Sequence, residues 1–161
     1  MAYIKYKLLI SLLSICFIYS CNTDKETIDN KFYDTKSQTW KNYLTSIGMD
    51  ANLNGAVFLF VQSSSCAPCL KELRWWDDNF NKGNVYLIVI EQFASTYNSF
   101  LRINDLSLAA HQDSTALAFE KELIPFVPVK LYFNNKAQVV SIERIGSEGN
   151  LSSFLKKVDM E

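Results

Sequence analysis

Apolar residues along the chain follow two patterns: continuous runs, and positions that recur with helical spacing. A continuous apolar run bounded by turn residues is typical of a strand buried on both faces of a sheet. The strands predicted in this way are 56–62, 85–90, 129–133 and 139–145, whereas 106–110 is either a further strand or a loop. Polar turns adjoin these runs, with Asn54-Gly55 before the first and 134–136 between the last two.

Apolar residues at i, i+3, i+4 and i+7 predict amphipathic helices between these strands. The predicted helices are one that Ser37 caps and that ends near Gly48, one that begins near Ala67, a short one that contains Tyr97, Phe100 and Leu101, one capped by Asp113 or Ser114, and a last one from Leu151 to Val158. In the second helix Leu73, Trp76 and Phe80 continue the apolar stripe. We expect Arg74, Asp77 and Asp78 to lie on the other side of this helix. Strands that alternate with helices indicate an α/β fold built from βαβ units.

The first twenty residues have the organisation of a secretory signal rather than of a folded segment. Lys5 and Lys7 precede the apolar run Leu8–Ile18, which is shorter than the roughly 20 residues that a membrane-spanning helix needs. The run ends in Ile18-Tyr19-Ser20-Cys21, which resembles a bacterial lipobox, where the cysteine is lipidated and becomes the new N-terminus. The alternative is an uncleaved signal anchor. Both would export the domain and attach it to a membrane of the cell envelope, outside the cytoplasm.

The chain is therefore expected to have three parts: a lipoprotein signal peptide at 1–20, a lipidated tether at 21–36 that begins with Cys21, and one folded domain at 37–161. The tether is polar and lacks periodicity, as expected of a segment that buries too little apolar surface to fold. Hydrophobic residues make up 48% of the 161 positions, which is enough for a core. The net charge of −1 gives no indication of a nucleic-acid partner.

Two cysteines three residues apart carry the candidate chemistry. Cys66-Ala67-Pro68-Cys69 follows the first strand and opens the second helix. Residues i and i+3 lie on one helical face, close enough for a disulfide. Cys66 lies near the unsatisfied N–H groups and the positive end of the helix dipole, which favour the thiolate that attacks disulfides. Cys69, one turn inside the helix, can resolve the mixed disulfide that Cys66 forms.

Two other uses of these cysteines, a structural zinc site and a haem attachment, are excluded by the residues around them. A structural zinc site needs about four ligands, and only the single His111 could join Cys66 and Cys69. A c-type haem attachment needs a histidine after the second cysteine, where Leu70 stands. We therefore expect no cofactor and no bound metal.

With this motif the chain resembles the thioredoxin superfamily, and within it the membrane-tethered bacterial thiol–disulfide oxidoreductases of the TlpA/ResA kind. Beside the strand–CxxC–helix unit, the resemblance rests on Leu70-Lys71-Glu72 and on Val127-Pro128 before a late apolar strand, and it covers roughly residues 40–158. It implies a thioredoxin-like α/β fold in which a central mixed β-sheet is flanked by helices on both faces. It also implies that Pro128 is cis and shapes the site, and that Val127, Ala67 and Pro68 contact an extended substrate chain.

The resemblance implies an oxidoreductase whose partners are protein thiols and disulfides and an upstream electron donor of the cell envelope. Ala67-Pro68 places no histidine between the cysteines, which favours a more reducing couple and hence a reductase of exported proteins. Two alternatives stay open, a non-catalytic binding module and a copper-delivery protein. In copper-handling relatives a distant histidine, here His111, joins the two cysteines as a ligand.

The chain also departs from the common thioredoxin pattern. Thioredoxins commonly place tryptophan directly before the first cysteine and a polar or acidic residue six positions before it, where this chain has Ser65 and Phe60. Glu72 matches an acid common in the TlpA/ResA kind, and the resemblance makes it a candidate proton relay for Cys69. The alternative for Glu72 is a solvated position on the helix surface.

Overall fold

The computed structural model describes residues 30–80, 84–147 and 150–158. The expected signal peptide at 1–20 and the expected lipidation site, Cys21, lie outside the described residues. The strands are β1 (Val57–Gln62), β2 (Val85–Ile90), β3 (Ala109–Asp113), β4 (Val129–Phe133) and β5 (Val139–Arg144). The helices are the 3-10 helix η2 (Asn30–Phe32) and the α-helices α2 (Ser37–Ser46), α3 (Ala67–Phe80), α4 (Ala94–Asn104), α5 (Leu117–Glu120) and α6 (Asn150–Val158). No helix within these residues is long and apolar enough to cross a bilayer.

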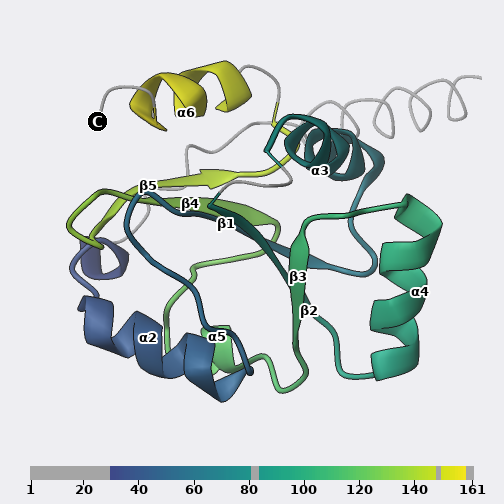
Figure 1. Ribbon diagram of the computed structural model, residues 1–161, viewed down its shortest axis with the longest axis horizontal. Coiled ribbons are helices and arrows are strands. Elements are labelled where there is room, and N and C mark those ends of the chain that lie inside the picture. The colour runs from purple at the N-terminus through teal and green to yellow at the C-terminus, as the bar shows by residue number, and fades with distance from the viewer. Residues whose placement is uncertain (1–29, 81–83, 148–149, 159–161) are drawn as a thin grey trace, which may run out of the picture.

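The strands of the described residues form one mixed sheet in the order β3-β2-β1-β4-β5. β1, β2 and β3 are parallel, whereas β4 runs antiparallel to both β1 and β5. Parallel neighbours need a crossover connection, so α3 links β1 to β2 and α4 links β2 to β3 (Figure 1). Because β4 is antiparallel to β1, its first residue lies beside the C-terminal end of β1, where the CxxC motif begins.

Helices cover both faces of the sheet, which confirms the predicted architecture. In Figure 1, α3 and α6 lie on one side of the sheet, and α2 and α5 lie on the other. Along β1, Val57, Leu59 and Val61 enter the core beneath α3 and α6, whereas Phe58 and Phe60 enter the core beneath α2. Burial of each such side chain stabilises the fold by roughly 1.5–3 kcal/mol. β1 is therefore held on both faces, and it fixes the position of the motif that follows it.

The folded part begins earlier than the predicted boundary at residue 37. Phe32 is buried in the core beneath α2, and Tyr33 packs against that core. The expectation for 21–36 rested on its polar composition, but one buried aromatic side chain contributes enough to order the residues beside it. The expected tether therefore overlaps the fold from Asn30 onward.

The two predicted helix caps have different outcomes. Ser37 is the first residue of α2 and not its cap, because Lys36 occupies the N-cap position and makes no side-chain hydrogen bond there. Asp113 does satisfy the start of α5, since its carboxylate accepts hydrogen bonds from the N–H of Leu117 at 2.8 Å and of Ala118 at 2.9 Å. The sequence thus identifies residue types that cap helices, but not their position relative to the first turn.

Two further expectations are corrected near α3. The ambiguous segment 106–110 contributes a strand, but that strand is β3 at Ala109–Asp113. Asp77, expected on the outer side of α3, is buried and accepts hydrogen bonds from the backbone N–H and the hydroxyl of Ser107 at 3.0 and 2.9 Å. The loop before β3 therefore covers a helix face that helical spacing alone assigned to solvent.

Candidate functional site

Cys66 and Cys69 form a disulfide at the junction of β1 and α3, with their Cα atoms 5.2 Å apart. Cys66 occupies the N-cap position, where its carbonyl accepts a hydrogen bond from the N–H of Leu70 at 3.0 Å. Cys66 is exposed, as are Ala67 and Pro68, whereas Cys69 is only 1% exposed. An external thiol or disulfide therefore reaches the sulfur of Cys66 and not that of Cys69.

The loop between β1 and the CxxC motif is held by two serine side chains. The hydroxyl of Ser65 donates to the carbonyl of Gln62 at 2.6 Å, and that of Ser63 donates to the carboxylate of Glu91 just after β2. The hydrogen bond from Ser63 is the main influence that lowers the pKa of Glu91. These contacts give the chain a defined path into α3, so that Cys66 stands at a fixed place at the helix start.

The Val127–Pro128 peptide bond is cis, the form that the resemblance implies. Both residues are half-buried and lead directly into β4, which pairs with β1. The carbonyl of Pro128 accepts a hydrogen bond from the N–H of Ile145 at 3.3 Å. The next residue, Gly146, lies against the backbone of Cys69. The residues just after β5 thus connect the cis-proline to the cysteine motif.

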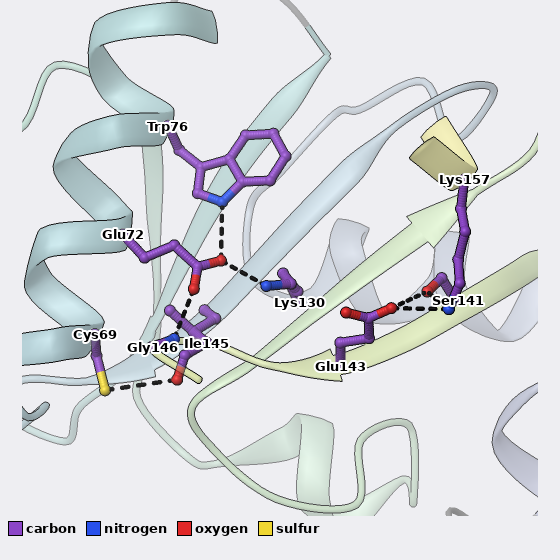
Figure 2. A network of polar contacts seen from close by, with 9 residues as sticks. All are labelled: Cys69, Glu72, Trp76, Lys130, Ser141, Glu143, Ile145, Gly146 and Lys157. Carbon is purple, nitrogen blue, oxygen red and sulfur yellow. Dashed lines mark hydrogen bonds and ion pairs between the residues drawn. The ribbon is translucent and has the colours of Figure 1, made fainter. Parts of the chain in front are cut away.

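Glu72 is buried, so the alternative of a solvated position on the helix surface is wrong. Its Oε1 accepts a hydrogen bond from Nε1 of Trp76 at 3.3 Å and forms an ion pair with Nζ of Lys130 at 2.7 Å (Figure 2). Its Oε2 accepts a hydrogen bond from the N–H of Gly146 at 2.6 Å. A buried carboxylate is strongly unfavourable unless it is paired and hydrogen-bonded, and these three donors meet that requirement.

Lys130 is the residue of this site that the sequence did not reveal. It lies in the middle of β4, its side chain is fully buried, and its ammonium group contacts Glu72 of α3. The ring of Phe154 in α6 lies 5.2 Å from Nζ, within the range of a cation–π interaction. The sequence did contain one indication of this pair, the lysine within an apolar strand, because a buried charge there needs an opposite charge from another element.

One peptide group links Glu72 to Cys69. The carbonyl oxygen of Ile145 lies 3.8 Å from Sγ of Cys69, and the N–H of the same peptide group, which belongs to Gly146, donates to Glu72 (Figure 2). Gly146 has φ of +82°, and a Cβ atom there would lie 2.8 Å from the backbone nitrogen of Cys69. Glycine is needed here because it tolerates this φ and lets the two backbones approach each other.

His111 and Phe60 lie away from the disulfide. His111 is a half-buried residue of β3, and burial lowers its pKa because the charged form is less well solvated. Within the described residues there is no group of three or more side chains that could hold a metal ion. Phe60 packs against Trp40 and Tyr43 on the sheet face opposite Cys69. The carboxylate of this site therefore comes from α3 and not from β1.

Comparison with solved structures shows that the chain has a thioredoxin-like fold, here with a CxxC disulfide at the start of α3. No family model and no curated protein matches the sequence. The solved structures that it resembles include thiol–disulfide exchange proteins of bacteria, and all of those described below share less than a fifth of their residues with it.

A candidate thiol:disulfide interchange protein DsbE from Chlorobium tepidum superposes with a TM-score of 0.57 at 12% identity, over 66% of this chain and 79% of that one. A secreted disulfide oxidoreductase from Mycobacterium tuberculosis, homologous to DsbE of E. coli, gives 0.52 at 17% identity, over 65% and 84%. The thioredoxin domain of a thiol-disulfide oxidoreductase from Bacteroides vulgatus gives 0.52 at 15%, over 66% and 81%. At these identities the likeness establishes the fold.

Replacement of Gly146 tests the close approach of β5 to the cysteine motif. We expect Gly146→Ala to lower the free energy of unfolding by about 3 kcal/mol, because alanine disfavours the positive φ and its Cβ overlaps the backbone of Cys69. The measurement is urea unfolding of the oxidised protein.

Gly48→Ala is the matched control, because Gly48 also has a positive φ, +73°, but nothing lies within 4 Å of a Cβ built there. We expect a loss of about 1 kcal/mol from the backbone alone. Equal losses in the two variants would contradict a close contact at Gly146.

Proposed function

We propose that this chain is an exported, membrane-anchored thiol–disulfide oxidoreductase that reduces disulfides of exported proteins through Cys66 and Cys69. The observation that carries the proposal is the unequal exposure of a disulfide at a helix start, with Cys66 open to solvent and Cys69 buried. A pair of this kind exchanges with an external disulfide at one sulfur and closes on itself with the other.

In the reducing direction, the thiolate of Cys66 attacks one sulfur of the substrate disulfide. The other substrate sulfur leaves as a thiolate and takes a proton from water. Cys69 then loses its proton and attacks the sulfur of Cys66, which releases the second substrate thiol and restores the Cys66–Cys69 disulfide. Two electrons pass to the substrate, so an electron donor of the cell envelope must reduce the protein again.

The neighbouring residues receive roles in this scheme. Glu72 would influence the loss of the Cys69 proton through the Ile145–Gly146 peptide group, whose N–H donates to its carboxylate and whose carbonyl faces that cysteine, while the proton itself passes to water. Val127 would offer its backbone to an extended stretch of the substrate, with Pro128 shaping the site behind it. Ala67 and Pro68 are exposed beside the reactive sulfur and would form the rest of the contact surface.

Two observations favour these assignments over the alternatives. The solved structures with this fold include a secreted disulfide oxidoreductase from M. tuberculosis, and secretion agrees with the signal expected at residues 1–20. His111 lies on β3 and in no group of three metal-ligating side chains among the described residues. The copper-delivery alternative therefore has no specific observation in its favour.

Replacement of each cysteine tests the assignment of nucleophile and resolving residue. We expect Cys69→Ser to accumulate a mixed disulfide between Cys66 and a substrate peptide, because no second thiol releases it. Cys66→Ser should lose exchange almost completely, since its remaining sulfur is buried. Mass spectrometry after acid quenching measures the adducts. A mixed disulfide on Cys69 would contradict the assignment, and no exchange in the wild type would indicate a non-catalytic binding module.

The reduction potential tests the reducing direction. We expect a value near that of thioredoxin, about −270 mV, because Ala67 and Pro68 bring no charged group that would stabilise the Cys66 thiolate further. Equilibration with a series of glutathione ratios measures it. A potential near about −120 mV, that of a strongly oxidising envelope protein, would show that the protein does not act as a reductase.

Replacement of Cys21 tests the lipid anchor. In cells that express the full chain and are fed a labelled fatty acid, the wild type should incorporate the label and Cys21→Ala should not. Cys66→Ser is the control and should keep the label, because its change lies in the folded domain. Labelling of Cys21→Ala equal to that of the wild type would contradict lipidation at this residue.

A further inference from the structure

We propose that Lys130 is a positioning residue for thiol–disulfide exchange, which acts on Cys69 through Glu72 and the Ile145–Gly146 peptide group. This role rests on the proposed function, because it concerns the same cysteine pair. Lys130 is too deeply buried to meet a substrate. Its effect is on the stability of Cys69 in its reduced form.

Lys130 and Glu72 depend on each other for their burial. Nζ and Oε1 are 2.7 Å apart, and the two side chains are 0% and 6% exposed. A buried ion pair that loses one partner leaves an uncompensated charge, which is strongly unfavourable. The cation on β4 is therefore what allows the carboxylate of Glu72 to be buried between α3 and the sheet.

Glu72 in turn orients one peptide group. The hydrogen bond of 2.6 Å from the N–H of Gly146 to Oε2 holds that peptide so that the carbonyl of Ile145 faces Sγ of Cys69 (Figure 2). A peptide N–H that donates to an anion becomes polarised, and its carbonyl oxygen becomes a stronger acceptor. Lys130 thus influences Cys69 indirectly, by fixing the direction of the Ile145 carbonyl group and its strength as a hydrogen-bond acceptor.

This carbonyl distinguishes the two redox states of Cys69. In the disulfide the sulfur carries no proton, so it donates nothing to the oxygen 3.8 Å away. Two molecules of glutathione reduce the protein by breaking the Cys66–Cys69 bond, and they form one glutathione disulfide while their two protons and two electrons pass to the cysteines. One proton resides on Cys69, whose thiol then donates to the carbonyl of Ile145. The network therefore stabilises the dithiol relative to the disulfide.

Lys130→Met tests this role, because methionine fills a similar volume without a charge. Without the cation, the carboxylate of Glu72 is a buried charge with no opposite charge beside it. It then turns toward water, which weakens its hold on the N–H of Gly146. We expect the equilibrium with glutathione at fixed pH to move about fivefold toward the disulfide, the size expected for the loss of one hydrogen bond. Alkylation and mass spectrometry of the folded protein across a series of glutathione ratios measure the dithiol fraction.

Lys157→Met is the matched control. Lys157 pairs with Glu143 of β5 at 2.8 Å (Figure 2), and this pair involves atoms other than the Ile145–Gly146 peptide. The equilibrium should therefore equal that of the wild type. Glu72→Gln removes the charge at the other end of the pair and should reproduce the shift of Lys130→Met. The double variant Lys130→Met/Glu72→Gln should shift the equilibrium no further than either single variant does, because both changes act through the carbonyl of Ile145.

A folded Lys130→Met protein, shown by cooperative urea unfolding, that keeps the wild-type equilibrium would overturn the proposal. Single shifts that add in the double variant would do the same. If Lys130→Met does not fold, Glu72→Gln is compared with Lys157→Met instead. A folded Glu72→Gln protein with the same glutathione equilibrium as Lys157→Met would then overturn the proposal. Failure of the wild-type protein to exchange with glutathione would instead refute the proposed oxidoreductase function, and this inference with it.

Discussion

The ion pair between Glu72 and Lys130 is the interaction on which the site depends. Two opposite charges lie between α3 and the sheet, in a layer formed mainly by apolar side chains such as Leu73 and Trp76. Apolar residues of similar shape often stabilise a fold as well as a buried ion pair does, so the value of this pair lies in what it positions. It joins α3 to β4, and through Gly146 it reaches the end of β5.

The cysteine pair takes its asymmetry from the same packing. The residues just after β5 lie against the first turn of α3 and cover Cys69, whereas Cys66 stands at the helix N-cap in contact with solvent. The helix dipole favours a thiolate at the exposed position. At the covered position, the carbonyl of Ile145 can accept a hydrogen bond from the thiol of Cys69. One packing arrangement therefore gives the two sulfurs different environments, as an exchange reaction with an attacking and a resolving thiol requires.

The sheet and the disulfide could be predicted because they leave local patterns in the sequence. Continuous apolar runs mark strands buried on both faces, and two cysteines three positions apart after such a run mark the motif. The burial of Glu72 could not be predicted, because its partner Lys130 lies 58 positions away and a glutamate on a helix has the same spacing whether solvated or paired. The prediction for Asp77 was wrong for the same reason, since a loop 30 positions away covers this residue. The predicted start of the domain was too late because one aromatic residue of the polar segment, Phe32, is buried in the core.

The most direct measurement is a crystal structure of the reduced protein. The account predicts that the thiol of Cys69 stays within hydrogen-bonding distance of the carbonyl of Ile145, and that Glu72 keeps its contacts with Lys130 and Gly146, while only Cys66 changes its side-chain position. A reduced protein in which Cys69 turns away from Ile145, or in which Glu72 leaves Gly146, would contradict the account, because the buried pair would then have no connection to the state of the sulfur.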